Sequence, residues 1–138
     1  MTLRIQSLSK SEIKKYKPKE NERTILISIQ DGKKRYLPFK ERTNHITRRR
    51  YKDILFLYFD DLTSKEIQEH PYQPFIYNDE DNQLILNFLQ KHYEKKDFDR
   101  ILIHCEAGMS RSHAIALFTA KYFEKDENLY NTLLYQEN

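Results

Sequence analysis

The sequence predicts an α/β domain built on a central, mainly parallel β-sheet of about four to five strands flanked by α-helices. Three apolar runs, at residues 24–29, 54–59 and 100–104, have the β-branched and aromatic composition of buried strands. Two longer segments, residues 78–95 and 110–123, carry apolar residues at helical spacing. Because strands and helices alternate along the chain, we expect parallel strands covered by helices.

The N-terminal third predicts shorter elements. Residues 3–8 alternate apolar and polar side chains, which predicts a half-buried strand, and residues 11–16 predict a short helix. The Asp31-Gly32 pair marks a turn, and residues 36–39 predict a short extended piece. The polar residues 42–50 predict a loop.

The remaining segments are bounded by turn residues and a helix cap. Residues 62–78 contain Pro71 and Pro74 and predict loop with a helical turn. Asn78 has the character of an N-cap for the helix that comes after it. Residues 129–135 predict one more short helix at the C-terminal end.

Composition predicts a single domain over residues 1–138. That length suffices for a real core, to which ten Tyr and eight Phe contribute large apolar area. We expect no membrane-spanning segment and no signal peptide, because no apolar run is long enough. Cys105, the one cysteine, excludes an internal disulfide and favours a reducing, cytoplasmic setting.

The net charge of +3 hides an asymmetry along the chain. Residues 1–50 carry 15 Lys and Arg against 5 Asp and Glu, a balance of +10, which leaves −7 for residues 51–138. The densest basic point is Arg48-Arg49-Arg50. Such a run is usually a solvated surface. The alternative is a basic rim that attracts phosphorylated, polyanionic partners.

The segment around Cys105 carries the functional signal. An apolar strand ends at His104, the cysteine comes next, Gly108 lies within the next turn, and a helix-like segment begins near Arg111. A strand, a tight loop and a helix N-terminus together form an anion site. At such a site a cysteine is stabilised as the thiolate, the form that attacks phosphorus, and an arginine adds a bidentate donor for phosphoryl oxygens.

The run His104-Cys-Glu-Ala-Gly-Met-Ser-Arg-Ser112 resembles the His-Cys-x5-Arg-Ser/Thr signature of cysteine-dependent protein tyrosine phosphatases. Its form is most similar to the small dual-specificity-like branch, including compact bacterial and viral members. The resemblance covers residues 53–123, where strand, amphipathic helix and loop have the family's order, and it is loose over residues 1–52. A C-x5-R pair alone is common; the surrounding residues make this one specific. The alternative is a buried structural cysteine.

The resemblance implies a role for each loop residue. Cys105 is the nucleophile that forms a cysteinyl-phosphate, Arg111 binds the phosphoryl oxygens, and Ser112 assists breakdown of the intermediate. His104 orients the loop and tunes the cysteine. The chemistry needs no metal and no cofactor. The phosphate cradle is completed by backbone amides of the loop, from Glu106, Ala107, Gly108, Met109 and Ser110 to Arg111.

The resemblance also implies a general acid, an aspartate on the loop after the strand that precedes the long helix. Asp61 fits that place best, and Asp60 is the alternative. Asp61 lies 44 residues before Cys105, a longer gap than many family members show. The other aspartate of the pair would then be a helix cap or part of a loop ion pair. The same acid would activate water for the second step.

The expected substrate is phosphotyrosine in a protein or peptide, with phosphoserine and phosphothreonine also open. Vanadate and sulfate are expected to bind the same loop. Glu106-Ala107 also resembles the loop of cysteine-type phytases, which keeps inositol phosphates open, and RNA 5′-triphosphates remain a further alternative. Related lipid phosphatases carry lysines where this loop has Glu106 and Met109, which disfavours a highly charged substrate. A phospho-binding module without turnover is the non-enzymatic alternative; membrane and nucleic-acid partners are not expected.

Overall fold

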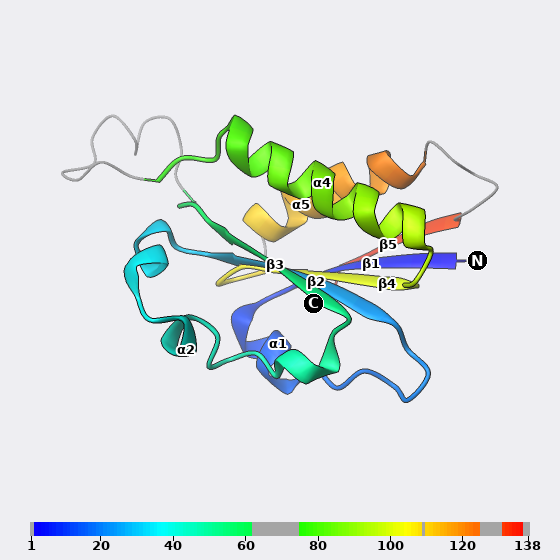
Figure 1. Ribbon diagram of the computed structural model, residues 1–138, viewed down its shortest axis with the longest axis horizontal. Coiled ribbons are helices and arrows are strands. Elements are labelled where there is room, and N and C mark those ends of the chain that lie inside the picture. The colour runs from blue at the N-terminus through cyan, green and yellow to red at the C-terminus, as the bar shows by residue number, and fades with distance from the viewer. Residues whose placement is uncertain (1, 62–74, 109, 125–130, 137–138) are drawn as a thin grey trace.

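The sheet of this protein consists of five parallel strands in the order β3-β2-β4-β1-β5 (Figure 1). The structure is a computed structural model that describes residues 2–61, 75–108, 110–124 and 131–136. The strands are β1 Thr2–Leu8, β2 Thr24–Gln30, β3 Asp53–Tyr58, β4 Arg100–His104 and β5 Asn131–Gln136. The predicted α/β class with a parallel central sheet is confirmed.

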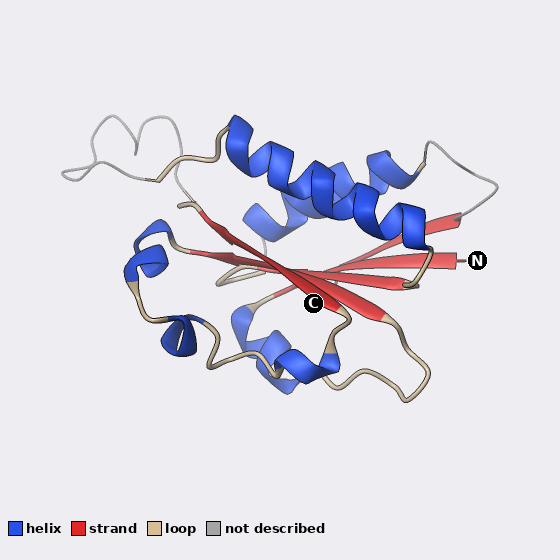
Figure 2. Ribbon diagram, viewed as in Figure 1, coloured by secondary structure: helices blue, strands red, loops and turns tan. Residues whose placement is uncertain are grey.

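Helices cover both faces of the sheet (Figure 2). The short helix α1 Lys10–Lys15 lies on one face with the β2–β3 crossover, which contains the 3₁₀ helices η1 Gly32–Tyr36 and η2 Arg48–Arg50 and the helix α2 Phe39–Arg42. The longer helices α4 Asp79–Lys95 and α5 Arg111–Phe123 lie on the other face. None of the helices in the described part of the chain has the length and apolar character needed to span a bilayer.

Local sequence explains where the main helices start. Ser9 before α1 and Asn78 before α4 each form a capping box with the acidic residue three positions later. The capping residue predicted for α4 is therefore confirmed. At Ser110, before α5, no side chain caps the helix, and the backbone N–H of Ser112 in its first turn donates to Cys105.

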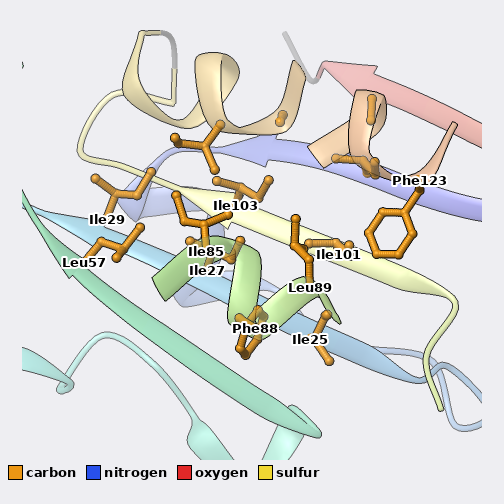
Figure 3. Close-up of a cluster of buried hydrophobic side chains, with 14 of the residues drawn as sticks. Ile25, Ile27, Ile29, Leu57, Ile85, Phe88, Leu89, Ile101, Ile103 and Phe123 are labelled. Carbon is orange, nitrogen blue, oxygen red and sulfur yellow. The ribbon is translucent and has the colours of Figure 1, made fainter. Parts of the chain in front are cut away.

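The pleat of the strands divides the core into two clusters. Ile25 and Ile27 of β2 and Ile101 and Ile103 of β4 face α4 and α5 (Figure 3). The other face buries a smaller cluster, which consists of Leu8, Ile13, Leu26, Ile46, Tyr51 and Leu102. His104, the last residue of β4, belongs to this second face because it is two positions after Leu102.

One local expectation holds only in part and another is wrong. Of residues 36–39, expected to be extended, Leu37 is extended, whereas Tyr36 ends the 3₁₀ helix η1 and Phe39 begins α2. Residues 129–135, expected to be a helix, contain most of β5, which pairs with β1. The long segment with Pro71 and Pro74 lies outside the described residues except at its two ends.

Candidate active site

The register of the sheet brings the carboxyl ends of three strands together. His104 lies level with Leu8 of β1 and Ser28 of β2, so Cys105 comes after β4 at the carboxyl ends of both neighbours. The chain leaves β1 toward α1 on one face and leaves β4 toward α5 on the opposite face. Such a switch point opens a crevice between adjacent strand ends, which is where parallel sheets bind ligands.

The loop between β4 and α5 depends on Gly108. This residue has φ +73°, and a Cβ there would lie 2.5 Å from the backbone nitrogen of Ser9 and 2.6 Å from the carbonyl carbon of Leu8. The loop lies against the end of β1, because Cys105 N–H donates to Leu8 O at 3.3 Å and Lys10 N–H donates to Glu106 O at 3.1 Å. Only glycine combines this backbone conformation with so close an approach.

The sulfur of Cys105 lies buried at the base of this loop. Gly108 N–H donates to Sγ at 3.2 Å, and Ser112 Oγ lies 3.2 Å from the same atom. Burial alone would raise the pKa of the thiol. Hydrogen bonds from the Ser112 hydroxyl and backbone and from Gly108, with the charge of Arg111, outweigh it and lower the pKa of Cys105 below its ordinary value.

A second serine, which the sequence did not single out, supports Ser112. Ser7 of β1 is buried, with Oγ 2.6 Å from Ser112 Oγ and 3.3 Å from the carbonyl oxygen of Gly108. With a neutral thiol, Cys105 donates to Ser112 Oγ and Ser7 donates to the carbonyl oxygen of Gly108. When Cys105 is a thiolate, Ser112 donates to the sulfur, and Ser7 can donate to Ser112 Oγ in place of Gly108 O. The sequence feature that could have identified Ser7 is its position: it is a polar residue two positions after Ile5, on the apolar face of the strand.

Arg111 reaches the same edge from the first turn of α5. It is 8% exposed, and its Nη1 donates to Asp31 Oδ1 and to Phe59 O, both at 2.9 Å. Its Nε is buried without a hydrogen-bond partner in the described part of the chain. The guanidinium is therefore fixed by two strand ends while retaining donor capacity. Asp31 was predicted only as a turn residue, although it comes after a buried strand just as Asp60 does.

The two candidate acids have different surroundings. Asp60 accepts Gly32 N–H and Phe75 N–H, each at 2.9 Å, so both of its carboxylate oxygens are occupied by backbone. Asp61 is exposed, and its Oδ1 accepts the hydroxyl of Ser110 at 3.0 Å. The geometry thus makes Asp60 a residue that fixes the loops around it and leaves Asp61 at the rim of the loop between β4 and α5.

His104 belongs to a buried polar cluster and contacts the backbone of the loop between β4 and α5. Its Nδ1 donates to Cys105 O at 3.3 Å, which leaves Nε2 to accept the hydroxyl of Ser28 at 2.7 Å. His45 Nε2 lies 3.4 Å from the same nitrogen. Burial, His45 and nearby cations lower the pKa of His104 to about 3; burial and three lysines lower the pKa of His45 to about 4. Both rings are therefore neutral, and His45 had no signal in the sequence.

A largely apolar cavity of about 350 Å³ adjoins the loop at its Ser110 end. Aromatic rings contribute to its wall: Phe59 and Tyr77 pack edge to face with centroids 5.1 Å apart. The lining residues are Phe59, Tyr77, Asn82, Ser110, Arg111, Ala114, Ile115 and Phe118. A cavity of this volume, with Arg111 in its wall, has room for an aromatic ring.

The predicted loop residues lie together, with one exception that the structure does not describe. His104, Cys105, Arg111 and Ser112 are buried around the loop, whereas Glu106, Ala107 and Ser110 are exposed on it. Met109 lies outside the described residues. Across the described ranges no three His, Cys, Asp or Glu side chains cluster as metal ligands would.

Comparisons with known proteins add no relative. No protein-family model matches the chain, and searches of curated proteins and of solved structures found no significant similarity. Any inference about function therefore depends on the residues, the fold and the geometry of the site.

Proposed function

We propose that the protein is a cysteine-dependent phosphatase that hydrolyses phosphate monoesters, with phosphotyrosine in proteins or peptides as the favoured substrate. One observation carries this proposal. The Cys105 sulfur accepts Gly108 N–H and lies 3.2 Å from Ser112 Oγ, at the N-terminus of a helix whose first residue is the buried Arg111. A thiolate, open backbone donors and a fixed guanidinium are what phosphoryl transfer to sulfur requires.

In the first step the thiolate of Cys105 attacks phosphorus. The S–P bond forms as the bond from phosphorus to the ester oxygen breaks, and the carboxylic acid of Asp61 transfers its proton to the departing oxygen. Arg111 and the loop N–H groups stabilise the negative charge on the other phosphoryl oxygens. The products of this step are an alcohol or phenol and cysteinyl-phosphate.

In the second step water attacks the cysteinyl-phosphate. The Asp61 carboxylate accepts a proton from the water as the new P–O bond forms, and the S–P bond breaks to release phosphate. The sulfur departs as a thiolate, which the Ser112 hydroxyl stabilises by donating to it. Asp61 ends the cycle protonated and Cys105 ends it ionised, so the enzyme returns to its starting state.

The cavity beside the loop supports an aryl phosphate as substrate. One of its lining residues is Ser110, whose hydroxyl donates to Asp61. A leaving group that receives a proton from Asp61 would therefore lie next to Phe59 and Tyr77. This favours phosphotyrosine over the shorter phosphoserine and phosphothreonine. We expect the enzyme in the cytoplasm, where reducing conditions keep a lone catalytic thiol reduced.

Hydrolysis of p-nitrophenyl phosphate and of a phosphotyrosine peptide, with EDTA and dithiothreitol present, tests the proposal. We expect vanadate-sensitive activity that Cys105→Ser abolishes. Asp61→Asn should lower kcat for the peptide roughly 100-fold, and less for p-nitrophenyl phosphate, whose leaving group needs less help from an acid. Asp60→Asn is the matched control: it should mainly lower stability, because one of its two backbone N–H partners loses an acceptor.

Other results would select another function. Folded wild-type protein that hydrolyses neither substrate but binds the phosphotyrosine peptide would be a phospho-binding module. Phosphate release from inositol phosphates or from RNA 5′-triphosphates, without release from the peptide, would identify a non-protein substrate.

A further inference from the structure

Two lysines from different crossovers meet beside the end of the loop that lies farther from Asp61. Lys10 begins α1, and its backbone N–H donates to the carbonyl oxygen of Glu106, the residue after the nucleophile, at 3.1 Å. Lys34 lies in η1, and its N–H donates at 3.0 Å to the carbonyl oxygen of Asp31, whose side chain binds Arg111. The two lysine side chains are neighbours, since the charges of Lys10 and of Glu106 both act on Lys34.

Among the described residues, the positive charges of these two lysines are not balanced by a carboxylate in contact with them. In the described part of the chain, neither ammonium group forms an ion pair with a carboxylate within 4 Å. The acids that act on Lys34 are Glu106, which is exposed, and Asp31, which already binds Arg111. Burial and the neighbouring Lys10 lower the pKa of Lys34. Two like charges held together without a shared carboxylate favour an anion between them.

The two ends of the loop therefore differ in chemistry. At Ser110 lie the carboxylate of Asp61 and the apolar cavity, which suit the leaving group. Near Glu106 lie two lysines, one bound to its carbonyl oxygen through the backbone and the other influenced by its charge, which the proposed mechanism does not use. The sequence disfavoured a highly charged substrate because the loop has Glu106 and Met109 where related lipid phosphatases have lysines. In the fold, positive charge near the loop comes instead from α1 and η1.

We propose that Lys10 and Lys34 form a second anion subsite, which binds a second phosphate group of a substrate whose first phosphate occupies the loop. The inference rests on the proposed phosphatase function for its biological meaning, although binding itself needs no turnover. Two ammonium groups offer up to six N–H donors, which match the oxygens and the double charge of a phosphate better than a single carboxylate does.

Calorimetric titration of the Cys105→Ser protein with orthophosphate, pyrophosphate and tripolyphosphate tests the subsite without catalysis. We expect at least one of the two longer anions to bind about tenfold more tightly than orthophosphate, the effect of one added charge-assisted contact. Lys10→Met and Lys34→Met should each reduce this preference severalfold. Lys40→Met, an exposed lysine of α2, removes the same charge and should leave the preference intact.

Two outcomes would overturn the subsite. One is a wild-type loop that binds all three anions equally; the other is equal loss of preference in the Lys40→Met control, which would indicate general attraction only. Absence of aryl phosphatase activity would instead contradict the proposed function, and the titration would still report on the lysines.

Measurements of turnover decide whether the second phosphate belongs to a phosphorylated peptide or to an inositol phosphate. Wild type and Lys34→Met are compared on a singly and a doubly phosphorylated peptide, and on an inositol monophosphate and a bisphosphate with adjacent phosphates. For each class of substrate, the kcat/KM of the doubly phosphorylated compound is divided by that of the singly phosphorylated one. The class for which this ratio falls in Lys34→Met is the source of the second phosphate. A variant that leaves both ratios unchanged would show that the lysines do not contact the substrate.

Discussion

A buried chain of three side chains runs from Ser7 through Ser112 to the sulfur of Cys105. Its first member comes from the N-terminal strand, more than a hundred residues before the helix that carries the second. When Ser7 donates to Ser112 Oγ instead of to the carbonyl oxygen of Gly108, the Ser112 proton is left for the thiolate. Ser7 is therefore a positioning residue for Ser112.

Ser7→Ala should raise the pKa of Cys105 by about half a unit, because Ser112 is then free to turn away from sulfur. Ser112→Ala, which removes the donor itself, should raise it by about one unit or more. The rate of alkylation by iodoacetamide, measured from pH 5 to 9, reports the thiolate directly. Ser11→Ala, at an exposed position on α1, is the control. Identical pH profiles for Ser7→Ala and Ser11→Ala would contradict the role of Ser7.

Individual site residues were predictable to the extent that they lie in one segment. Cys105, Arg111 and Ser112 fall within eight residues, so their chemistry is visible as a spacing. Ser7, Asp31 and His45 join them only because β1 and β2 flank β4 and the β2–β3 crossover folds back over the strand ends. That neighbourhood is a property of the sheet order, which no local pattern specifies.

At the scale of elements, local signals predicted the strong helices and failed for the marginal segments. Helix α4 has a capping box, three acids in its first turn and a buried stripe, all within one segment. Strand β5 has none of these advantages: Leu133 and Leu134 are 46% and 39% exposed, and its described partner is β1 alone. Its conformation comes from pairing with a distant strand, and tertiary contacts of this kind override local propensity.

The cap of α4 affects the site indirectly, because this helix begins at the cavity that adjoins the loop. Asn78→Ala removes the side-chain oxygen that accepts Asp81 N–H at 3.1 Å and should lower the free energy of unfolding by about 1 kcal/mol. Urea unfolding measures the change. Asn44→Ala, at an exposed asparagine in a turn, should have less than half this effect. Equal losses in the two variants would show that the cap does not stabilise the helix.

At the scale of the whole molecule, the two faces of the sheet have different roles. The face under α4 and α5 buries the larger apolar cluster and holds Cys105 against it. The opposite face buries a smaller cluster and, near the strand ends, the polar group of Ser28, His45 and His104. A neutral imidazole pair in that position can donate to the loop backbone without adding charge behind the thiolate. The same arrangement makes folding sensitive to acid.

Stability should fall as the pH drops below about 6.5, the ordinary pKa of histidine, because the unfolded chain then binds protons that His104 does not. The folded pKa of His104, about 3, is below the unfolded one, so the loss continues down to roughly that pH. Between pH 6.5 and pH 5 it should amount to roughly 1–2 kcal/mol for this residue.

Urea unfolding of the wild type and of His104→Gln at pH 7, 6 and 5 measures the dependence. Glutamine can still accept the Ser28 hydroxyl but does not titrate, so the variant should be less stable at pH 7 and lose less stability on acidification. His45, whose folded pKa is about 4, acts in the same direction. We therefore expect the double variant His45→Gln/His104→Gln to have the smallest slope. Equal slopes in the wild type and both variants would mean that the buried pair is not what makes the fold acid-sensitive.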